Sequence, residues 1–199
     1  MRRVSGASLY NIVVIMLNLF GNHSLIEGDY NLKDIRVVEE IGQGNSHVYK
    51  VMLHDNIYAL KQMEVKTDYE YQNFHNEISC MRDLSQASAY MIKYIGYFVT
   101  LHQVNQYSRR KYAHIIMECA EMNLQHLIAY RYSEGLRFTK DEILQVTGFL
   151  LQAFVDLEKN RIAHCDIKPE NILVVNANAL TMRLCDVGSC KVVSSEEIE

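Results

Sequence analysis

The sequence predicts an α+β fold in two parts, a small antiparallel sheet followed by a mainly helical region. Between Ile35 and Met63, short apolar segments alternate with glycine and asparagine turns, which is typical of antiparallel strands. After Cys119, longer stretches place apolar residues at helical spacing. Pro169 is the only proline and no low-complexity stretch interrupts the chain, so no stiff linker is expected between the parts.

Composition limits the classes of partner. Of the 199 residues, 49% are apolar, which is enough for a hydrophobic core. The formal net charge of -4 provides no broad positive field, so we expect neither a nucleic-acid partner nor an anionic membrane surface. The five cysteines are an odd number without a C-x-x-C pair. We therefore expect reduced thiols and a cytoplasmic or nuclear protein.

Residues 1–29 are expected to form an N-terminal extension. Arg2 and Arg3 precede an apolar run from Leu9 to Phe20, which imitates a secretory signal peptide. The run lacks a small-x-small cleavage site and is shorter than the ~20 residues that span a bilayer. We interpret it as a helix packed on the domain or a start outside it, and a membrane anchor is the weaker alternative.

The sheet is expected within residues 30–118. Its first three strands are RVVEEIGQG, HVYKVML and IYALKQM, with a turn at His54 to Asn56 between the last two. A helix is predicted for Asp68–Leu84, with Glu77 beside its apolar stripe. Two more strands are predicted at 92–100 and 113–118. The polar loop between them, with Arg109, Arg110 and Lys111, is interpreted as a solvated hairpin tip.

Residues 119–123 are expected to form a linker, and residues 124–199 the helical part. Thr139 and Glu142 have the spacing of a capping box, and the apolar residues that follow predict one long, largely buried helix ending at Asn160. A short strand is predicted for Ile172–Val175.

Three features of the sheet region suit phosphate binding, although each has an ordinary explanation. Gly42 and Gly44 lie between two strands, where backbone could approach phosphate, but a hairpin turn looks the same. Lys61 ends an apolar strand, as many solvated edge lysines do. Glu77 could pair with Lys61, or it could be a surface glutamate.

The stretch His164-Cys165-Asp166-Ile167-Lys168-Pro169-Glu170-Asn171 is more specific. It places an aspartate, a lysine and an asparagine in one short loop between a helix and a strand. Asp186 follows another apolar segment and precedes Val187 and Gly188. Phosphoryl transfer requires the triphosphate to be held, its charge neutralised by metal and the acceptor oxygen placed in line. These residue types supply all three requirements.

In this combination the chain resembles eukaryotic protein kinases of the serine/threonine type, from about Tyr30 to Lys191. The resemblance implies a two-lobe kinase fold with an incomplete helical lobe, ATP and Mg²⁺ as cofactors, and a protein substrate. It implies that Asp166 accepts the proton of the substrate hydroxyl and that Lys168 contacts the transferred phosphate. Lys61, fixed by Glu77, would contact the α and β phosphates.

The resemblance also implies the nucleotide and metal contacts. Asn171 and Asp186 would hold magnesium, Met117 would line the back of the adenine pocket, and Glu118 and Cys119 would offer hinge hydrogen bonds. The implied nucleotide-binding residues are Ile41, Gly42, Gly44, Val48, Ala59, Lys61, Met117, Glu118, Cys119, Asn171, Leu173 and Asp186. All of this requires Lys61, Asp166, Asn171 and Asp186 to converge around one metal-bound triphosphate.

A finer resemblance rests on the stretches IYALK, FHNEI and IIMECAEMNLQ. They are similar to the monopolar-spindle dual-specificity checkpoint kinases, which have a methionine-glutamate-cysteine hinge. None of these stretches contains a reacting group, so the biological role does not follow from them.

Three positions depart from the kinase pattern. The glycine turn is one residue shorter than usual between Gly44 and Val48, with His47 near the place of a third glycine. Cys165 replaces an arginine that clamps a phosphorylated activation loop in many kinases, so we do not expect that switch here. Val187 replaces a phenylalanine, which keeps the metal aspartate but removes bulk beside it.

The chain ends at Glu199, before an activation segment or later helices. Each large apolar side chain that the helix 139–160 leaves in water forgoes about 1.5–3 kcal/mol. A few of them amount to the ~5–15 kcal/mol that keeps a domain folded. We expect a piece of a longer active kinase, or a protein partner that covers the helical part. The alternative is a non-catalytic module that binds nucleotide or serves as a scaffold.

Overall fold

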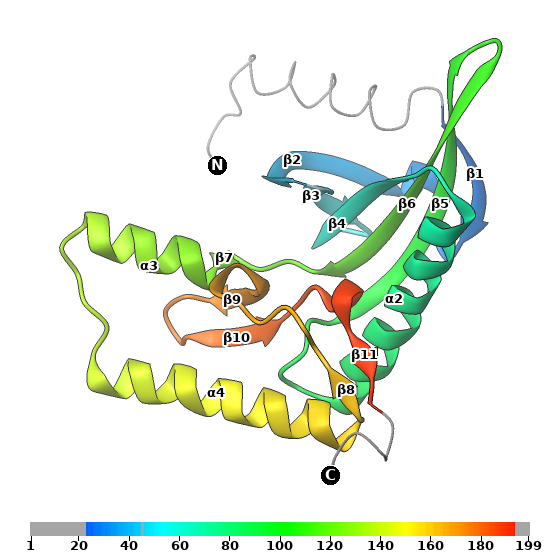
Figure 1. The fold of residues 1–199 in the computed structure, drawn as a ribbon. Coiled ribbons are helices and arrows are strands. Elements are labelled where there is room, and N and C mark those ends of the chain that lie inside the picture. Colours follow the sequence, from blue (N-terminus) through cyan, green and yellow to red (C-terminus); the bar gives the residue numbers. More distant parts are fainter. Residues whose placement is uncertain (1–22, 45, 194–199) are drawn as a thin grey trace. The chain divides into compact units, whose positions relative to one another are not determined.

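The computed structural model describes residues 23–44 and 46–193 (Figure 1). The chain divides into two compact units. Unit 1 contains the chain up to Phe74 together with Ile95–Cys119, and unit 2 contains His75–Tyr94 and the chain from Ala120 onward. An antiparallel sheet in unit 1 and helices with small sheets in unit 2 confirm the α+β class. The apolar run Leu9–Phe20 lies outside the described residues.

Unit 1 is built on a six-stranded sheet with the strand order β1-β5-β6-β4-β3-β2. The pairings of β1 with β5, β2 with β3, β3 with β4 and β4 with β6 are antiparallel. A single 3₁₀ turn, Leu32–Asp34, precedes β2. The strands are β1 His23–Gly28, β2 Ile35–Gln43, β3 His47–Leu53, β4 Asn56–Val65, β5 Tyr94–Asn105 and β6 Ser108–Glu118.

The two faces of this sheet have different roles. A cluster of buried side chains on one face forms the core of unit 1: Ile35, Val37, Tyr49, Val51, Leu53, Leu60, Phe98 and Ile116. Because successive residues of a strand point to opposite faces, Ala59 and Lys61 lie on the other face from Leu60. Packing of the core therefore fixes which face carries Lys61.

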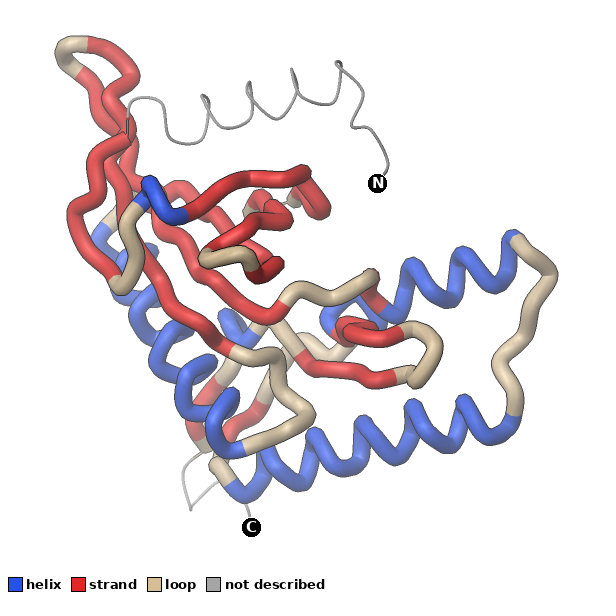
Figure 2. The backbone as a smooth tube through the Cα atoms, turned by 180° about the vertical axis from the view of Figure 1, so that it is seen from behind, coloured by secondary structure: helices blue, strands red, loops and turns tan. Residues whose placement is uncertain are grey.

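The structure confirms the predicted position of one hairpin turn and corrects that of another. Between β3 and β4, His54 and Asp55 adopt left-handed φ angles of 47° and 63°, which is a two-residue hairpin at the predicted position. The predicted polar tip at Arg109–Lys111 was wrong, since these residues belong to β6. The β5–β6 hairpin is a long ribbon (Figures 1 and 2) whose outer part has no buried face, so its strands carry no apolar alternation.

Helix α2, Asp68–Ala87, begins in unit 1 and continues in unit 2. Its start is a capping box that the sequence analysis missed. The Glu70 backbone N–H donates to the Thr67 hydroxyl at 3.1 Å, and the Thr67 N–H donates to the Glu70 carboxylate at 3.0 Å. The predicted apolar stripe of Phe74, Ile78, Met81 and Leu84 is buried, as expected for this helix.

Unit 2 contains most of α2, the helices α3 and α4, and two small sheets. A three-stranded sheet has the order β10-β9-β7, and β11 pairs with β8. Unit 2 also contains two 3₁₀ turns, η2 Pro169–Asn171, which begins directly after Lys168, and η3 Val187–Ser189, which begins directly after Asp186. The remaining elements are β7 Met122–Asn123, α3 Leu124–Ser133, α4 Lys140–Lys159, β8 Ile162–Ala163, β9 Ile172–Asn176, β10 Thr181–Leu184 and β11 Lys191–Val192.

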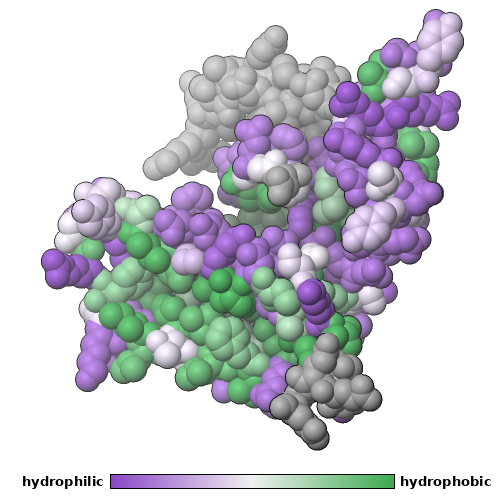
Figure 3. All heavy atoms as spheres, in the orientation of Figure 1, coloured by the Kyte–Doolittle hydropathy of each residue, from purple (hydrophilic) through white to green (hydrophobic). Residues whose placement is uncertain are grey.

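Helix α4 has its predicted limits but not its predicted burial. Thr139 and Glu142 form the expected capping box, and Asn160 is the C-cap. Its buried residues are Phe149, Ala153 and Leu157. An apolar α4 face of Ile143, Leu144, Leu151, Phe154 and Val155 is exposed, and Figure 3 shows apolar side chains gathered over this part of unit 2. The prediction of a largely buried helix was wrong because an apolar stripe does not say which other element covers it.

Within residues 23–44 and 46–193, none of the helices has the length and apolar character required to cross a bilayer.

Candidate active site

One face of the unit 1 sheet gathers several residues expected to contact nucleotide. Lys61 lies directly opposite Val48 of β3, and Ala59 lies opposite Met117 of β6. Directly opposed residues of antiparallel strands point to the same face. Since Ala59 and Lys61 are two residues apart, all four side chains lie on that face. Lys50, which lies opposite Ala59, is on this face as well, so the face combines apolar side chains with two ammonium groups.

The glycine turn between β2 and β3 is only partly within the described residues, because residue 45 is not among them. Gly42 pairs with Val48, and the register shifts between Glu40 and Gly42, which makes Ile41 a β-bulge. His47, near the place of the third glycine in related sequences, contacts Glu40 at 2.7 Å between Nδ1 and Oε1. That contact holds His47 against the neighbouring strand.

The last strand of unit 1 leads into the predicted hinge. Glu118 ends β6 opposite Tyr58, and Cys119 is the last residue of the unit. Burial raises the pKa of the half-buried Cys119 thiol above its ordinary value. In unit 2, the predicted nucleotide-binding residue Leu173 is the second residue of β9, paired with Asn123 of β7 and Arg183 of β10.

The loop that leads into η2 brings together the side chains of two predicted catalytic residues, Asp166 and Lys168, and of the predicted metal ligand Asn171. The Lys168 ammonium donates to Asp166 Oδ2 at 2.6 Å, and the Asn171 amide donates to the same oxygen at 2.9 Å. The Asn171 amide also lies 2.9 Å from the Asp166 carbonyl oxygen. Asn171 is 6% exposed, so the loop is closed around a buried amide. The Asp166 carboxylate therefore has one oxygen fixed by two donors.

These contacts determine the charge of the loop. The hydrogen bond from Lys168, followed by the one from Asn171, lowers the pKa of Asp166 below its ordinary value. The same pairing raises the pKa of Lys168. Both groups are therefore ionised at neutral pH, and Asp166 is an acceptor of hydrogen bonds there.

Backbone contacts place Asp186 beside this loop. The Cys185 N–H donates to the Asn171 carbonyl at 2.9 Å, and the His164 ring contacts the Cys185 carbonyl at 3.0 Å through Nε2. The other ring nitrogen of His164 accepts from the Asp166 N–H at 3.4 Å. His164 thus bridges the Asp166 loop and the Asp186 segment, a role that its position two residues before Asp166 did not reveal.

Asp186 itself adopts an unusual backbone conformation. Its φ of 63° and ψ of 67° are left-handed, which is uncommon for a residue other than glycine. Cys165, next to Asp166, has φ of 63° as well. Strained positions of this kind are concentrated at functional sites, where the surrounding structure holds them.

Glu77 also belongs to unit 2. It lies on α2 and is 8% exposed, and a Cβ atom built on Gly188 would be 3.4 Å from its Oε2 atom. The turn after Asp186 therefore lies against this part of α2. Lys61 belongs to unit 1, so its convergence with Glu77, Asp166, Asn171 and Asp186 stays a prediction.

The donors of unit 2 fit magnesium. Because the Asn171 nitrogen donates to Asp166, the amide oxygen is the atom left for a cation. Asp186 supplies a carboxylate nearby. Mg²⁺ is usually held by one or two protein oxygens together with water and substrate phosphate. Among the described residues, no group of three histidine, cysteine or carboxylate side chains could hold a metal by itself.

Comparison with known proteins decides the family. The model of the protein kinase domain matches residues 35–198. The chain belongs to the protein kinase family. This kinase therefore has the fold class and the family that its glycine turn, catalytic loop and Asp-Val-Gly segment predict.

Its relatives are serine/threonine kinases by name. The kinase is 32% identical over 166 residues to the serine/threonine-protein kinase MPS1 of Encephalitozoon cuniculi, which covers 82% of this chain and 25% of the relative. It is 31% identical to a probable serine/threonine-protein kinase MRK1 homolog of the same organism, in an alignment that covers 81% of this chain and 46% of the relative. It is 30% identical to the serine/threonine-protein kinase mph1 of Schizosaccharomyces pombe, in an alignment that covers 77% of this chain and 21% of the relative. The kinase thus spans less than half the length of these relatives.

The comparison supports the resemblance to the monopolar-spindle kinases, since a protein named MPS1 is among the relatives. The MRK1 homolog is almost equally similar. Sequence identity at this level shows the family and the serine/threonine class of its relatives.

Proposed function

We propose that this kinase transfers the γ-phosphate of ATP to a serine or threonine hydroxyl of a protein substrate, with Mg²⁺ as the metal. The observation that carries the proposal is the arrangement of Asp166, Lys168 and Asn171 around one carboxylate oxygen. The similarity to the monopolar-spindle kinases adds tyrosine as a second possible acceptor, which phosphoamino-acid analysis of the product would distinguish.

Asp166 would position and deprotonate the acceptor hydroxyl. Lys168 and Asn171 hold Oδ2, and within the described part of the chain Oδ1 accepts no hydrogen bond. A substrate hydroxyl can donate to Oδ1, which directs its lone pair toward the phosphorus. The low pKa of Asp166 keeps it ionised, so it accepts the proton late, as the P–O bond forms.

Lys168 would donate hydrogen bonds to the transferred phosphate. An ammonium group has three N–H donors, and the contact with Asp166 uses one of them. The other two can donate to phosphate oxygens while Asp166 stays fixed. Asn171 and Asp186 would hold Mg²⁺, which neutralises charge on the phosphates when it is bound.

Unit 1 would hold the rest of the nucleotide. The apolar side chains of Val48, Ala59 and Met117 suit an adenine ring, and Lys61 on the same face suits the α and β phosphates. The glycine turn and the backbone of Glu118 and Cys119 would complete the contacts.

The test is phosphotransfer from labelled ATP by the 199-residue chain. Loss of the positioned base in Asp166→Ala is expected to lower turnover by roughly 10²- to 10⁴-fold. The matched control is Asp83→Ala, which removes an exposed carboxylate of α2 and should leave turnover unchanged. Equal turnover in the wild type and Asp166→Ala would refute the assignment.

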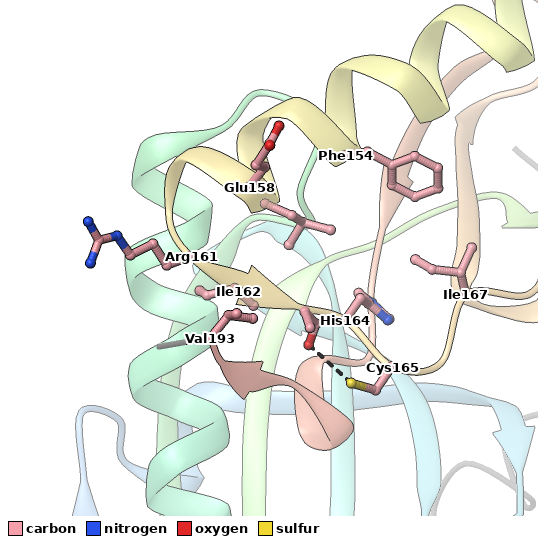
Figure 4. A pocket seen from close by; sticks show the side chains of 10 residues that line it. Phe154, Glu158, Arg161, Ile162, His164, Cys165, Ile167 and Val193 are labelled. Atoms are coloured by element: carbon pink, nitrogen blue, oxygen red, sulfur yellow. Dashed lines mark hydrogen bonds between the residues drawn. The ribbon is translucent and has the colours of Figure 1, made fainter. Parts of the chain in front are cut away.

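A second function is supported by the apolar α4 face. Beside it lies a groove of about 430 Å³ between the end of α4 and β8 (Figure 4). Phe154, Leu157, Ile162 and Ile167 line it, whereas Asp166, Asn171 and Asp186 do not. Such a surface suits a protein partner. A nucleotide-binding scaffold would show a thermal shift with ATP and Mg²⁺ but form no labelled product, and product formation would rule that reading out.

We also propose a cytoplasmic or nuclear location, because the reaction needs ATP and none of the five cysteines, all of them within the described residues, forms a disulfide. If deletion of residues 1–25 leaves the distribution of the kinase in the cell unchanged, the membrane-anchor alternative is excluded.

A further inference from the structure

Two thiols of unit 2 that no step of phosphoryl transfer uses lie in contact. Cys80 is on α2, and Cys190 follows the η3 turn. The two side chains are close enough for each thiol to shift the pKa of the other, and each is partly exposed. The thiol pair, Cys80 and Cys190, thus links a helix to a segment more than a hundred residues later in the chain.

Several contacts independent of the thiols bring the pair together. Gly188 approaches Glu77 so closely that an added Cβ atom would be 3.4 Å from the carboxylate. Cys80 lies one helical turn after Glu77 and so on the same side of α2. Cys190 lies two residues after Gly188. The η3 turn therefore carries Cys190 to the face of α2 that bears Cys80.

Cys190 is also held from its other side. Its N–H donates to the Val187 carbonyl at 3.0 Å, and its thiol donates to the His164 carbonyl at 3.7 Å. The next residue, Lys191, pairs with Ala163 in the β8–β11 sheet. These contacts keep the Cys190 sulfur in place.

The two sulfurs are not equivalent. The contact with Cys190 lowers the pKa of Cys80, and the same contact, followed by burial, raises the pKa of Cys190. The thiolate is the nucleophilic form of cysteine, so Cys80 is the sulfur that reacts first. No group of three metal-binding side chains occurs among the described residues, so the thiols are not part of a metal cluster.

We propose that Cys80 and Cys190 form a peroxide-sensitive oxidation site that closes into a disulfide. In the first step the Cys80 thiolate attacks hydrogen peroxide, the O–O bond breaks, and with one proton Cys80 becomes a sulfenic acid and water is released. In the second step Cys190 sulfur attacks the sulfenic sulfur, its thiol proton leaves with the hydroxyl group as water, and the S–S bond forms. Two thiols are oxidised by two electrons and one peroxide is reduced to two waters.

The disulfide would connect the element that bears Glu77 to the segment that follows Asp186. Both ends lie within unit 2. The bond would limit opening of the η3 turn away from α2, because it adds a covalent link to an existing contact.

The direct test treats the reduced 199-residue chain with hydrogen peroxide and maps disulfides by non-reducing peptide mass spectrometry. The expected product is a peptide pair joined through Cys80 and Cys190, two hydrogen atoms lighter than the reduced peptides. Dithiothreitol should reverse it. A linkage of Cys190 to the exposed Cys165, or sulfinic acid on Cys80 with no linkage, would overturn the proposal.

Variants sharpen the assignment. Cys80→Ser and Cys190→Ser should each abolish the linkage, whereas Cys119→Ser, which removes a partly buried thiol of unit 1, should leave it unchanged. The wild-type map does not depend on how well the variants fold, so it decides the question by itself.

A second readout follows the consequence of the bond. Amide hydrogen exchange of residues 187–193 should slow several-fold in the oxidised wild type and return after reduction. Exchange that is unchanged in a fully cross-linked sample would refute the proposed restraint. Neither readout requires phosphotransfer, so a failure of the kinase assay would leave this test intact.

Discussion

At the scale of single residues, the ion pair of Lys168 and Asp166 controls the state of the proposed base. Lys168→Met keeps the length of the side chain and removes its charge. Because the hydrogen bond from Lys168 is the largest cause of the lowered pKa, that pKa is expected to move back toward its ordinary value in the variant. Titration of the Asp166 carboxyl carbon by NMR measures it.

Lys159→Met is the matched control for this titration. It removes an ammonium group that lies 3.8 Å from Asp156 on α4 and that is not among the groups that shift the pKa of Asp166. The pKa of Asp166 should be the same in this variant as in the wild type. An unchanged value in Lys168→Met as well would show that Lys168 does not set the charge of Asp166.

Residue types and order were enough to predict that the side chains of Asp166, Lys168 and Asn171 meet. Asp166, Lys168 and Asn171 lie within six positions of one another, so a short loop had to bring them close. The role of His164 did not follow from the sequence, because its contact with the Cys185 carbonyl joins segments far apart in the chain. The pairing of Cys80 with Cys190 is long-range for the same reason.

At the scale of elements, the capping box of α4 gives a test of local stability. Thr139 accepts a hydrogen bond from the Glu142 N–H at 3.2 Å, and the Glu142 carboxylate accepts one from the Thr139 N–H at 2.7 Å. Thr139→Ala is expected to lower the free energy of unfolding by about 1 kcal/mol. Denaturant unfolding followed by circular dichroism measures it.

Thr147→Ala in the same helix is the control. The Thr147 hydroxyl donates back to the Ile143 carbonyl at 2.8 Å and caps no helix end. Alanine is the better helix former, so this change should be neutral or stabilise by a few tenths of a kcal/mol. Equal losses in the two variants would mean that the cap contributes nothing particular.

The predictions of helices and strands succeeded where nearby residues determine the limits of an element. They failed where the burial of a side chain depends on which other element packs against it. The limits of α4 follow from Thr139, Glu142 and Asn160, which act within one or two turns of the chain. The exposure of Leu144 and Leu151 depends on what packs against them, and periodicity carries no such information. Arg109 and Arg110 were assigned to a loop because a strand without a buried face shows no alternation.

At the scale of the whole molecule, the two histidines that contact Thr100, His23 and His114, make the free energy of unfolding depend on pH. Thr100 Oγ1 lies 2.9 Å from His23 Nδ1 and 3.0 Å from His114 Nε2, and His114 stacks on Phe98 at 4.3 Å between ring centroids. His114 is fully buried, and burial lowers its pKa to about 3. Burial is also the main cause that lowers the pKa of His23 to about 4.

Both pKa values are lower in the folded state than the ordinary value near 6.5, so the unfolded state binds more protons as the pH falls. Stability from these groups is complete above about pH 6.5 and is lost progressively as the pH falls toward the folded pKa values. For His114 the loss is about 2 kcal/mol at pH 5. His23 is half-buried, and solvent screening makes its share smaller.

The expected result is a free energy of unfolding that falls between pH 7 and pH 5 in the wild type and falls less steeply in His114→Phe. Phenylalanine keeps a flat ring against Phe98 and removes the titrating group. His126→Gln, which changes an exposed histidine of α3, should keep the wild-type slope. Because each protein is compared with itself at two pH values, a lower stability of His114→Phe at pH 7 does not obscure the slope. Equal slopes in all three proteins would remove His114 as the cause of acid sensitivity.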